Sequence, residues 1–292
     1  MTAFSATVRA DSVGPNGVRL TTLEVTFPRF ILAEFNTHRQ FSRNSGSSRA
    51  VPTRRLIRRI REAPVGPLDF RQNQAGMQGA GSIPGMGALK AHTVWGRAED
   101  SAAFYAQALS DIGVHKERTN RILEPFSWHT VIVTATEWSN FFAQRDHEAA
   151  DPAMQRTARL MREAMDESTP ATLQAGDMHL PYIEDKDRDA LTAEDMCRVS
   201  VARCARVSYL THDRRRDLAA DLDLYRRLAE GMHMSPFEHV AEALPKVMDR
   251  ADCAGYRADV LDVRPVMFSA VLWSGNFRGW KQVRKGIPGE CR

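Results

Sequence analysis

Apolar residues recur along the chain in patterns that predict a mixture of strands and helices. Residues 20–32 first alternate between polar and apolar positions and then run apolar, which indicates a strand that leads into a turn or helix near Pro28. Three longer segments show helical spacing and are bounded by capping residues or glycines. These are residues 93–112, 152–165 and 217–230.

A short amphipathic helix is predicted to follow Pro52, with Leu56, Ile57 and Ile60 facing inward. Its outward residues are Arg54, Arg55, Arg58, Arg59 and Arg61. We interpret these arginines as a solvated face, with a phosphate-binding patch as the alternative. The glycine-rich run at residues 76–87 follows no predicted strand and lacks a closing Gly-Lys-Ser/Thr, so it predicts a surface loop and not a phosphate loop.

Composition places the chain among ordinary globular proteins. Its 292 residues are 43% hydrophobic and 26% charged, which excludes disordered, collagen-like and small disulfide-stapled classes. The formal charge of +4 suits a small anionic ligand better than a long nucleic-acid duplex. Residues 168–195 are rich in charges and contain two prolines, so we predict a linker there between regions 1–167 and 196–292 of one structural domain.

The cysteines and the N-terminus bear on location and metal binding. No Cys-x-x-Cys pair occurs, so we expect no metal site, and we expect reduced thiols, with disulfides as the alternative. The four cysteines are Cys197, Cys204, Cys253 and Cys291. Neither a signal-peptide pattern nor a window that could span a membrane is evident, so we expect a cytoplasmic protein.

The densest group of polar residues lies between Asn36 and Arg49. It combines the guanidinium groups of Arg39 and Arg49 with several hydroxyls and small residues whose backbone amides can approach a ligand closely. This composition predicts an anion-binding site. A polar loop with serine N-caps is the alternative that composition alone leaves open.

The arrangement of these residues resembles the signature of the flavin-dependent thymidylate synthases, an Arg-His-Arg followed by seven residues and a Ser. Here His38-Arg39 is followed by seven residues and Ser47. Three more segments resemble motifs of the same family: Asn120–Pro125 with Glu137–Arg145, Ala205–Tyr209, and His233–His239. The resemblance implies an α+β fold with a mixed or antiparallel sheet and packed helices.

The chain departs from the family pattern in three ways. The Ala-Arg-Val-Ser and Ser-Pro-Phe-Glu-His segments follow the signature, whereas in the family they precede it, so the chain resembles the circularly permuted, phage-encoded branch. Thr37 replaces the first arginine of the signature, and Ser45 replaces its usual acidic residue.

The resemblance implies a reaction and its cofactors. Reduced FAD transfers the methylene of methylenetetrahydrofolate to C5 of dUMP, giving dTMP, and NADPH reduces the flavin. This agrees with the cysteines, none of which lies in a Pro-Cys-His setting suited to a covalent thiolate mechanism. The resemblance also implies a homotetramer whose active sites combine several subunits.

Individual roles are likewise implied by the resemblance. The residues implied to bind the nucleotide are Glu34, Ser47, Ser48, Arg49, Arg121 and Arg145. Among them, Arg145 and Ser47 are implied to be catalytic, with Arg145 stabilising charge that develops on the pyrimidine. The residues implied to contact FAD are His38, Arg39, Asn44, Asn140, Ser208, His233 and Ser235.

Three alternatives remain open from the sequence. A hydroxymethylase acting on dUMP or dCMP is suggested by Ser45. A basic nucleic-acid-binding protein would use the arginine-rich helix and the loop near Arg278 and Trp280, although we expect no nucleic acid as partner. A flavoprotein without turnover is suggested by Thr37.

Overall fold

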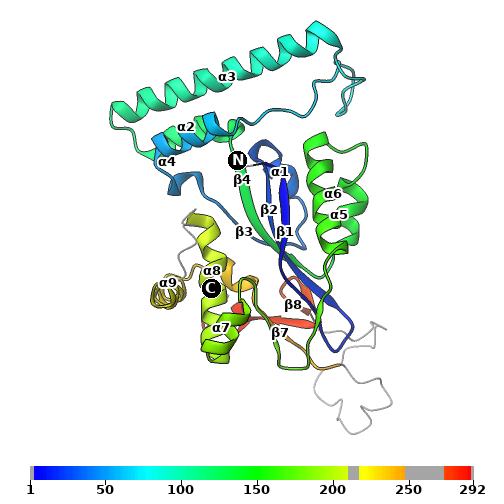
Figure 1. Ribbon diagram of the computed structural model, residues 1–292, viewed down its shortest axis with the longest axis vertical. Coiled ribbons are helices and arrows are strands. Elements are labelled where there is room, and N and C mark those ends of the chain that lie inside the picture. The colour runs from blue at the N-terminus through cyan, green and yellow to red at the C-terminus, as the bar shows by residue number, and fades with distance from the viewer. Residues whose placement is uncertain (1–2, 210–216, 247–272, 291–292) are drawn as a thin grey trace, which may run out of the picture.

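The centre of the molecule is a five-stranded mixed sheet, with strand order β3-β4-β2-β1-β5 (Figure 1). The computed structural model describes residues 3–209, 217–246 and 273–290. The sheet strands are β1 (Ser5–Val13), β2 (Arg19–Pro28), β3 (Ser42–Ser45), β4 (Trp128–Ala135) and β5 (Ala171–Thr172). All neighbours pair antiparallel except β1 and β5, which are parallel. This confirms the predicted α+β class with a mixed sheet, and β2 fulfils the strand prediction made from residues 20–32.

One face of this sheet is apolar and is covered by α5 (Ser139–Arg145) and α6 (Pro152–Asp166) (Figure 1). Strand alternation points Leu23, Val25 and Phe27 of β2 to this face, where they are buried against the methionine stripe of α6. Helix α6 matches the predicted segment 152–165. The Asp151 side chain caps its first backbone amides, which fixes its start.

A second layer lies beside the start of β4 and consists of three helices. They are α2 (Thr53–Glu62), α3 (Gly85–Asp111) and α4 (Lys116–Leu123). Leu56, Ile57 and Ile60 of α2 are buried here, as predicted, against alanines of α3. Of the five arginines expected to face outward, Arg59 is half-buried, because its position adjoins the buried side of the helix next to Ile60.

Helix α3 is longer than the predicted segment 93–112. It begins at Gly85, within the run of glycines that predicted a loop, whereas the residues before it remain irregular and form a bridge between Arg71 and Ser82. The early turns of α3 are largely exposed, so they carry no apolar periodicity by which the sequence could reveal them. Gly113, with a positive φ of 87°, follows its end as predicted.

The other face of the central sheet is polar and carries a continuous chain of buried hydrogen bonds. Ser12 Oγ lies 2.9 Å from His179 Nδ1, and His179 Nε2 lies 2.8 Å from Thr22 Oγ1. Thr22 Oγ1 in turn lies 2.7 Å from Thr134 Oγ1, which lies 2.8 Å from Nδ1 of His239. Burial lowers the pKa of each of the two histidines to about 3, so both rings are neutral.

The polar face is covered by segments from the C-terminal half of the chain. These are β6 (Met178–His179), α7 (Asp185–Ala190), α8 (Ala193–Tyr209), α9 (Leu218–Glu230), β7 (Ala241–Ala243), β8 (Trp273–Ser274), β9 (Phe277–Arg278) and β10 (Trp280–Gln282). Among them, α8 contacts β3 and β4, and α7 and α9 pack against α8. Strands β10, β7 and β6 form a separate antiparallel sheet. Helix α9 matches the predicted segment 217–230, with Asp217 as its N-cap.

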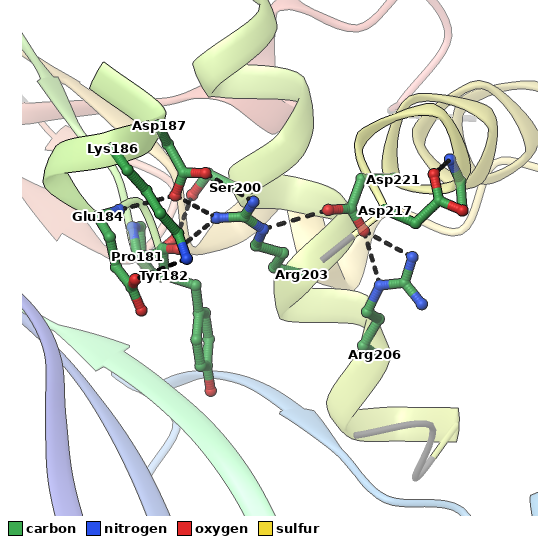
Figure 2. A network of polar contacts seen from close by, with 11 residues as sticks. Pro181, Tyr182, Glu184, Lys186, Asp187, Ser200, Arg203, Arg206, Asp217 and Asp221 are labelled. Carbon is green, nitrogen blue, oxygen red and sulfur yellow. Dashed lines mark hydrogen bonds and ion pairs between the residues drawn. The ribbon is translucent and has the colours of Figure 1, made fainter. Parts of the chain in front are cut away.

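The helices α7, α8 and α9 are joined by a network of buried charges (Figure 2). Arg203 of α8 donates to both carboxylate oxygens of Asp187, at 2.6 and 2.9 Å, and its Nε donates to Asp221 at 3.2 Å. Arg206, one turn further along α8, donates to the other oxygen of Asp221 at 2.7 Å. The network therefore fixes α8 between its two neighbours.

Residues 168–195, predicted as a linker, are folded. They contain β5, β6 and α7 and the start of α8, and His179 within them is fully buried. Leu180 packs in an apolar cluster with residues of α8 and α9, whereas His179 is buried through hydrogen bonds to the polar sheet face, which a hydrophobic pattern does not reveal. The division into regions 1–167 and 196–292 stays a prediction.

Two further predictions concern cysteines and membranes. Cys197 and Cys204 are free thiols, whereas Cys253 and Cys291 lie outside the described residues. Within the described ranges, no helix is both long and apolar enough to cross a membrane.

Candidate functional site

The edge strand β3 joins three segments that are far apart in sequence. The side-chain amide of Asn44 donates to the backbone carbonyl of Cys204 in α8 at 2.8 Å. The Ser235 hydroxyl donates to Asn44 Oδ1 at 3.3 Å from the start of the short helix η4 (Ser235–Glu238). Asn44 is 6% exposed, so it links the signature segment from within the protein to the residue that precedes Ala205–Tyr209 and to the His233–His239 motif.

A second group of predicted residues surrounds the guanidinium of Arg145 at the end of α5. Arg145 Nε donates to His38 Nε2 at 3.0 Å, and Arg145 Nη2 donates to the Thr37 hydroxyl at 3.1 Å. Glu34, in α1 (Leu32–Phe35), lies 3.9 Å from Arg145 Nη1. The arginine is thus oriented by three residues of the segment that precedes β3.

Burial and charge set the protonation of this group. Burial first, and then the neighbouring cations Arg145 and Arg43, lower the pKa of His38, which keeps its ring neutral and able to accept the hydrogen bond. Burial and then Asp151 raise the pKa of Glu34, against the opposing effect of Arg145. Thr37, where the family signature has an arginine, accepts a hydrogen bond from Arg145 and so helps to hold the guanidinium in place.

The third group joins the turn after β3 to the end of α4. Ser48, in η2 (Ser48–Ala50), donates to Glu124 Oε1 at 2.6 Å. Arg121 Nη1 donates to the same oxygen at 3.0 Å, and Arg29 Nη2 lies 3.1 Å from it. Glu124 opens η3 (Glu124–Phe126), and Arg29 opens η1 (Arg29–Ile31).

Two cavities adjoin these groups and share no lining residue. One, of about 580 Å³, is lined by Glu34, Arg145 and part of the 69–79 segment. The other, of about 260 Å³, is lined by Ser47 and Ser48 together with residues of α2 and β4. The predicted nucleotide residues therefore fall into two separate groups within one chain, and Arg49 is exposed beside the second of them.

The residues expected to contact FAD have a donor set that suits this cofactor. Those with described side chains provide imidazole, guanidinium, amide and hydroxyl groups and no carboxylate, as a diphosphate with ribityl hydroxyls requires. Arg39, Asn140, His233 and Ser235 are exposed, and Asn140 Oδ1 accepts a hydrogen bond from Gln144 Nε2 at 3.1 Å. The side chain of Ser208 lies outside the described part of the chain. These residues fit FAD. Within one chain, His38 and Arg39 precede β3, whereas Ser235 contacts Asn44 within it.

Sequence reasoning missed Arg29, Glu124 and the contribution of Thr37. Arg29 lies nearly 100 residues from Glu124, and no local pattern relates them. For Glu124 the available signal was its position three residues after Arg121, a spacing that places the two side chains on one helical face.

Together these groups form the candidate site, which surrounds the edge strand of an α+β sheet. Residues 18–171, just over half of the chain, match the family Thy1, thymidylate synthase complementing protein. The chain belongs to this family. No curated protein matches the chain.

Membership of this family confirms the function that the motifs implied. Thy1 proteins are FAD-dependent thymidylate synthases, and the chain is an enzyme that converts dUMP to dTMP. The matched segment includes the His-Arg signature and the central helices, whereas the Ala205–Tyr209 and His233–His239 motifs lie beyond it.

Proposed function

We propose that the chain performs this synthesis with its motifs in circularly permuted order, so that α8 and η4 complete a site begun by β3. The observation that carries the proposal is the junction at Asn44, which bonds to Cys204 and Ser235. Both partners come from beyond the segment matched by the family. A chain can be reordered in this way when the joined segments remain neighbours in space.

In this proposal, Ser47, Ser48, Arg49 and Arg121 bind the nucleotide phosphate or sugar. Arg121 is about half exposed, so its guanidinium can reach a ligand while Glu124 holds one end of it. Arginine suits this role because its planar donors match phosphate oxygens. The exposed guanidinium groups of Arg49 and Arg121 also favour the approach of an anionic substrate.

Arg145 is proposed to hold the carbonyl edge of the pyrimidine. Its guanidinium is oriented in advance by His38, Thr37 and Glu34, and its side chain is 22% exposed where it lines the larger cavity. A cation fixed in this way stabilises negative charge that develops on the ring without having to reorganise. Glu34 lies at the same cavity, where it can orient the base.

FAD, when bound, supplies the one-carbon and hydride chemistry that the side chains of the protein do not provide. We propose that Arg39 and His233 hold its anionic or polar groups. Asn44, Asn140 and Ser235 are proposed to contribute hydrogen bonds, and His38 a neutral ring beside the site. Methylenetetrahydrofolate and NADPH are the proposed co-substrates.

The two separate groups of nucleotide residues favour an assembly of several chains. A site that needs both Arg145 and Arg121 is completed most simply if a second copy supplies one of them. We therefore propose that the active form is a homotetramer, as the family resemblance implied. Light scattering of the purified protein tests this directly, and a fully active monomer would contradict it.

The decisive assay combines cofactor uptake with product analysis. The purified protein is expected to take up FAD and, with methylenetetrahydrofolate and NADPH, to add a methyl group to dUMP. Mass spectrometry of the nucleotide distinguishes this product from a hydroxymethyl product on dUMP or dCMP. A hydroxymethyl product, or bound FAD without turnover, would contradict the proposed reaction.

The permuted arrangement is tested by variants at the junction. Asn44→Ala and Ser235→Ala are expected to weaken FAD binding, because both remove polar groups from the proposed cofactor site. Ser101→Ala, at an exposed serine of α3, is the control and should leave FAD binding unchanged. Equal FAD affinity in all three variants would show that α8 and η4 do not complete the site.

A further inference from the structure

The C-terminal segment that the structure describes, residues 273–290, belongs to none of the four motifs and lies beyond the part of the chain that matches the family. Its strands β8 and β9 form a hairpin, and β10 pairs with β7 beside them. The resemblance gives this segment no role. Its side chains nevertheless contact three of the four motifs.

The first contact is with β3, the strand of the signature. Gln282 Nε2 donates to the Ser42 hydroxyl at 2.9 Å, and the side-chain amide of Asn276 donates to the same oxygen at 3.4 Å. Both Ser42 and Gln282 are almost fully buried, so water does not compete for this bond. Because Ser42 and Asn44 are two residues apart in a strand, they lie on the same face of β3. The bond to Ser42 therefore fixes the strand face that carries Asn44.

The second contact is with η4. Gln282 Nε2 also donates to the backbone carbonyl of Glu238 at 3.3 Å, and Arg284 forms an ion pair with the Glu238 carboxylate. One amide group thus bridges β3 and η4. These are the same two segments that meet through the hydrogen bond between Ser235 and Asn44.

The third contact is with the residues that lead into α5. The backbone N–H of Arg278 donates to the Thr136 hydroxyl at 3.2 Å, and its Nε donates to Glu137 at 2.9 Å. Helix α5 carries residues proposed to bind FAD and the pyrimidine. The side chains of Arg278 and Glu137 are about a third exposed, so this ion pair constrains its partners less than the buried amide of Gln282 does.

The backbone around Gln282 is shaped to hold its side chain. The N–H of Gln282 donates to the Ser274 hydroxyl at 3.3 Å. The adjoining turn contains Gly275, whose φ is 61°, and a Cβ at this position would lie 2.0 Å from Gln282 Oε1. Glycine is required there both by the positive φ and by the approach of the amide. The turn is therefore built around the position of one side chain.

We propose that Gln282 is a positioning residue for the cofactor site, whose amide group holds β3 and η4 at the spacing that Asn44 and Ser235 require. Polar groups that are held in place before a ligand arrives need not be ordered when it binds, so the affinity is higher. In this role Gln282 acts through Ser42 and the Glu238 carbonyl and needs no contact of its own with FAD. The inference rests on the proposed function, because FAD binding by Asn44 and Ser235 is part of that proposal.

The first test is Gln282→Met, which keeps the length of the side chain but removes both donated hydrogen bonds. FAD affinity, measured by fluorescence titration, should fall about tenfold. The visible circular dichroism of the bound flavin should change as well, because Asn44 and Ser235 are no longer held in register.

Trp280→Phe is the matched control in the same strand. The Trp280 ring is fully buried, and its Nε1 donates to the backbone carbonyl of Val18, which lies outside the motifs. This variant should lower the free energy of unfolding, measured in urea, but leave FAD affinity and the flavin signal unchanged. If Gln282 served stability alone, Gln282→Met would behave in the same way as this control.

A double-mutant cycle tests whether Gln282 acts through Ser42. Ser42→Ala alone should also weaken FAD binding. The combination of Ser42→Ala with Gln282→Met should bind FAD little more weakly than Gln282→Met alone, because the two side chains form one unit. If the two effects on affinity multiply, the residues act independently and the proposed route is wrong.

The inference fails if Gln282→Met binds FAD as tightly as the wild type, or if Trp280→Phe weakens FAD binding to the same extent. Failure of the proposed function gives a different result. A wild-type protein that takes up no FAD would overturn both the cofactor roles of Asn44 and Ser235 and the positioning role of Gln282. A wild-type protein that binds FAD and converts dUMP, with Gln282→Met unchanged in both respects, would overturn only the positioning role.

Discussion

Removing the carboxylate of Asp221 should destabilise the layer that covers the polar face of the sheet. Its side chain is 2% exposed and accepts from Arg203 at 3.2 Å and from Arg206 at 2.7 Å (Figure 2). Asp221→Ala leaves two guanidinium groups without this carboxylate in a largely buried setting. Breaking a buried ion pair from one side costs about 3–5 kcal/mol.

The structure places the expected loss near the lower end of that range. Arg203 keeps both of its bonds to Asp187, and Arg206 is 22% exposed, so water can solvate part of its charge. We therefore expect the free energy of unfolding to fall by about 3 kcal/mol. Because α8 also supplies the Cys204 carbonyl that holds Asn44, FAD affinity should fall with it.

Urea denaturation followed by circular dichroism measures this loss. The matched control is Asp223→Ala, which removes an exposed aspartate of the same helix that pairs with Arg226 and Arg227. Exposed pairs contribute little, so the control should unfold close to the wild type. If Asp221→Ala is no less stable than Asp223→Ala, the buried network does not hold the helices together as argued.

Three further predictions follow from buried and oriented groups. In the folded protein, the rings of His129, His179 and His239 remain neutral down to about pH 3. In the unfolded chain the same rings take up protons below about pH 6.5. The free energy of unfolding should therefore fall as the pH is lowered below about 6.5. Each ring should add about 1.4 kcal/mol per pH unit to the slope of the free energy of unfolding against pH. His179→Gln should lower this slope, measured by urea denaturation between about pH 6 and 5. An unchanged slope would show that this ring does not contribute. Thr37→Val removes one hydrogen bond to Arg145. Turnover of dUMP should fall about two- to tenfold, with little change in thermal stability. Turnover at the wild-type rate would mean that Thr37 does not orient the guanidinium. Burial raises the pKa of Cys204, so alkylation at pH 8 followed by mass spectrometry should leave this thiol unmodified until the protein unfolds; rapid labelling in the native state would refute its burial.

The sequence predicted those parts of the fold in which local signals and burial agree. Helix α6 has a capping aspartate, a proline in its first turn and a stripe of apolar residues, so its limits were predicted to within one residue. Helix α3 lacked such agreement, because its buried positions are alanines and its early turns are exposed. Residues 168–195 looked like a linker because charges and prolines surround the few apolar residues that pack in the core, such as Leu180, and because His179 is buried through hydrogen bonds.

The candidate site shows the same division. Motif spacing predicted His38, Ser48 and Arg145 as site residues, and the structure places Arg145 against His38. Spacing could not predict that Glu124 is shared by three donors, or that His129 lines a cavity, because these relations arise only when distant segments pack. Long-range pairing of polar groups is the information that a single sequence does not display.

The hydrogen-bond chain from Ser12 to His239 restricts how its protons can be arranged. Each hydroxyl has one proton and each neutral ring has one N–H, so every bond in the chain must run in the same direction. If His179 carries its proton on Nε2, then Thr22 donates to Thr134, Thr134 donates to His239, and His239 is protonated on Nε2 as well. If His179 carries its proton on Nδ1, the order reverses and His239 is protonated on Nδ1. The tautomers of two histidines 60 residues apart are therefore correlated, and the core of the molecule has two proton orderings that can interchange only as a whole.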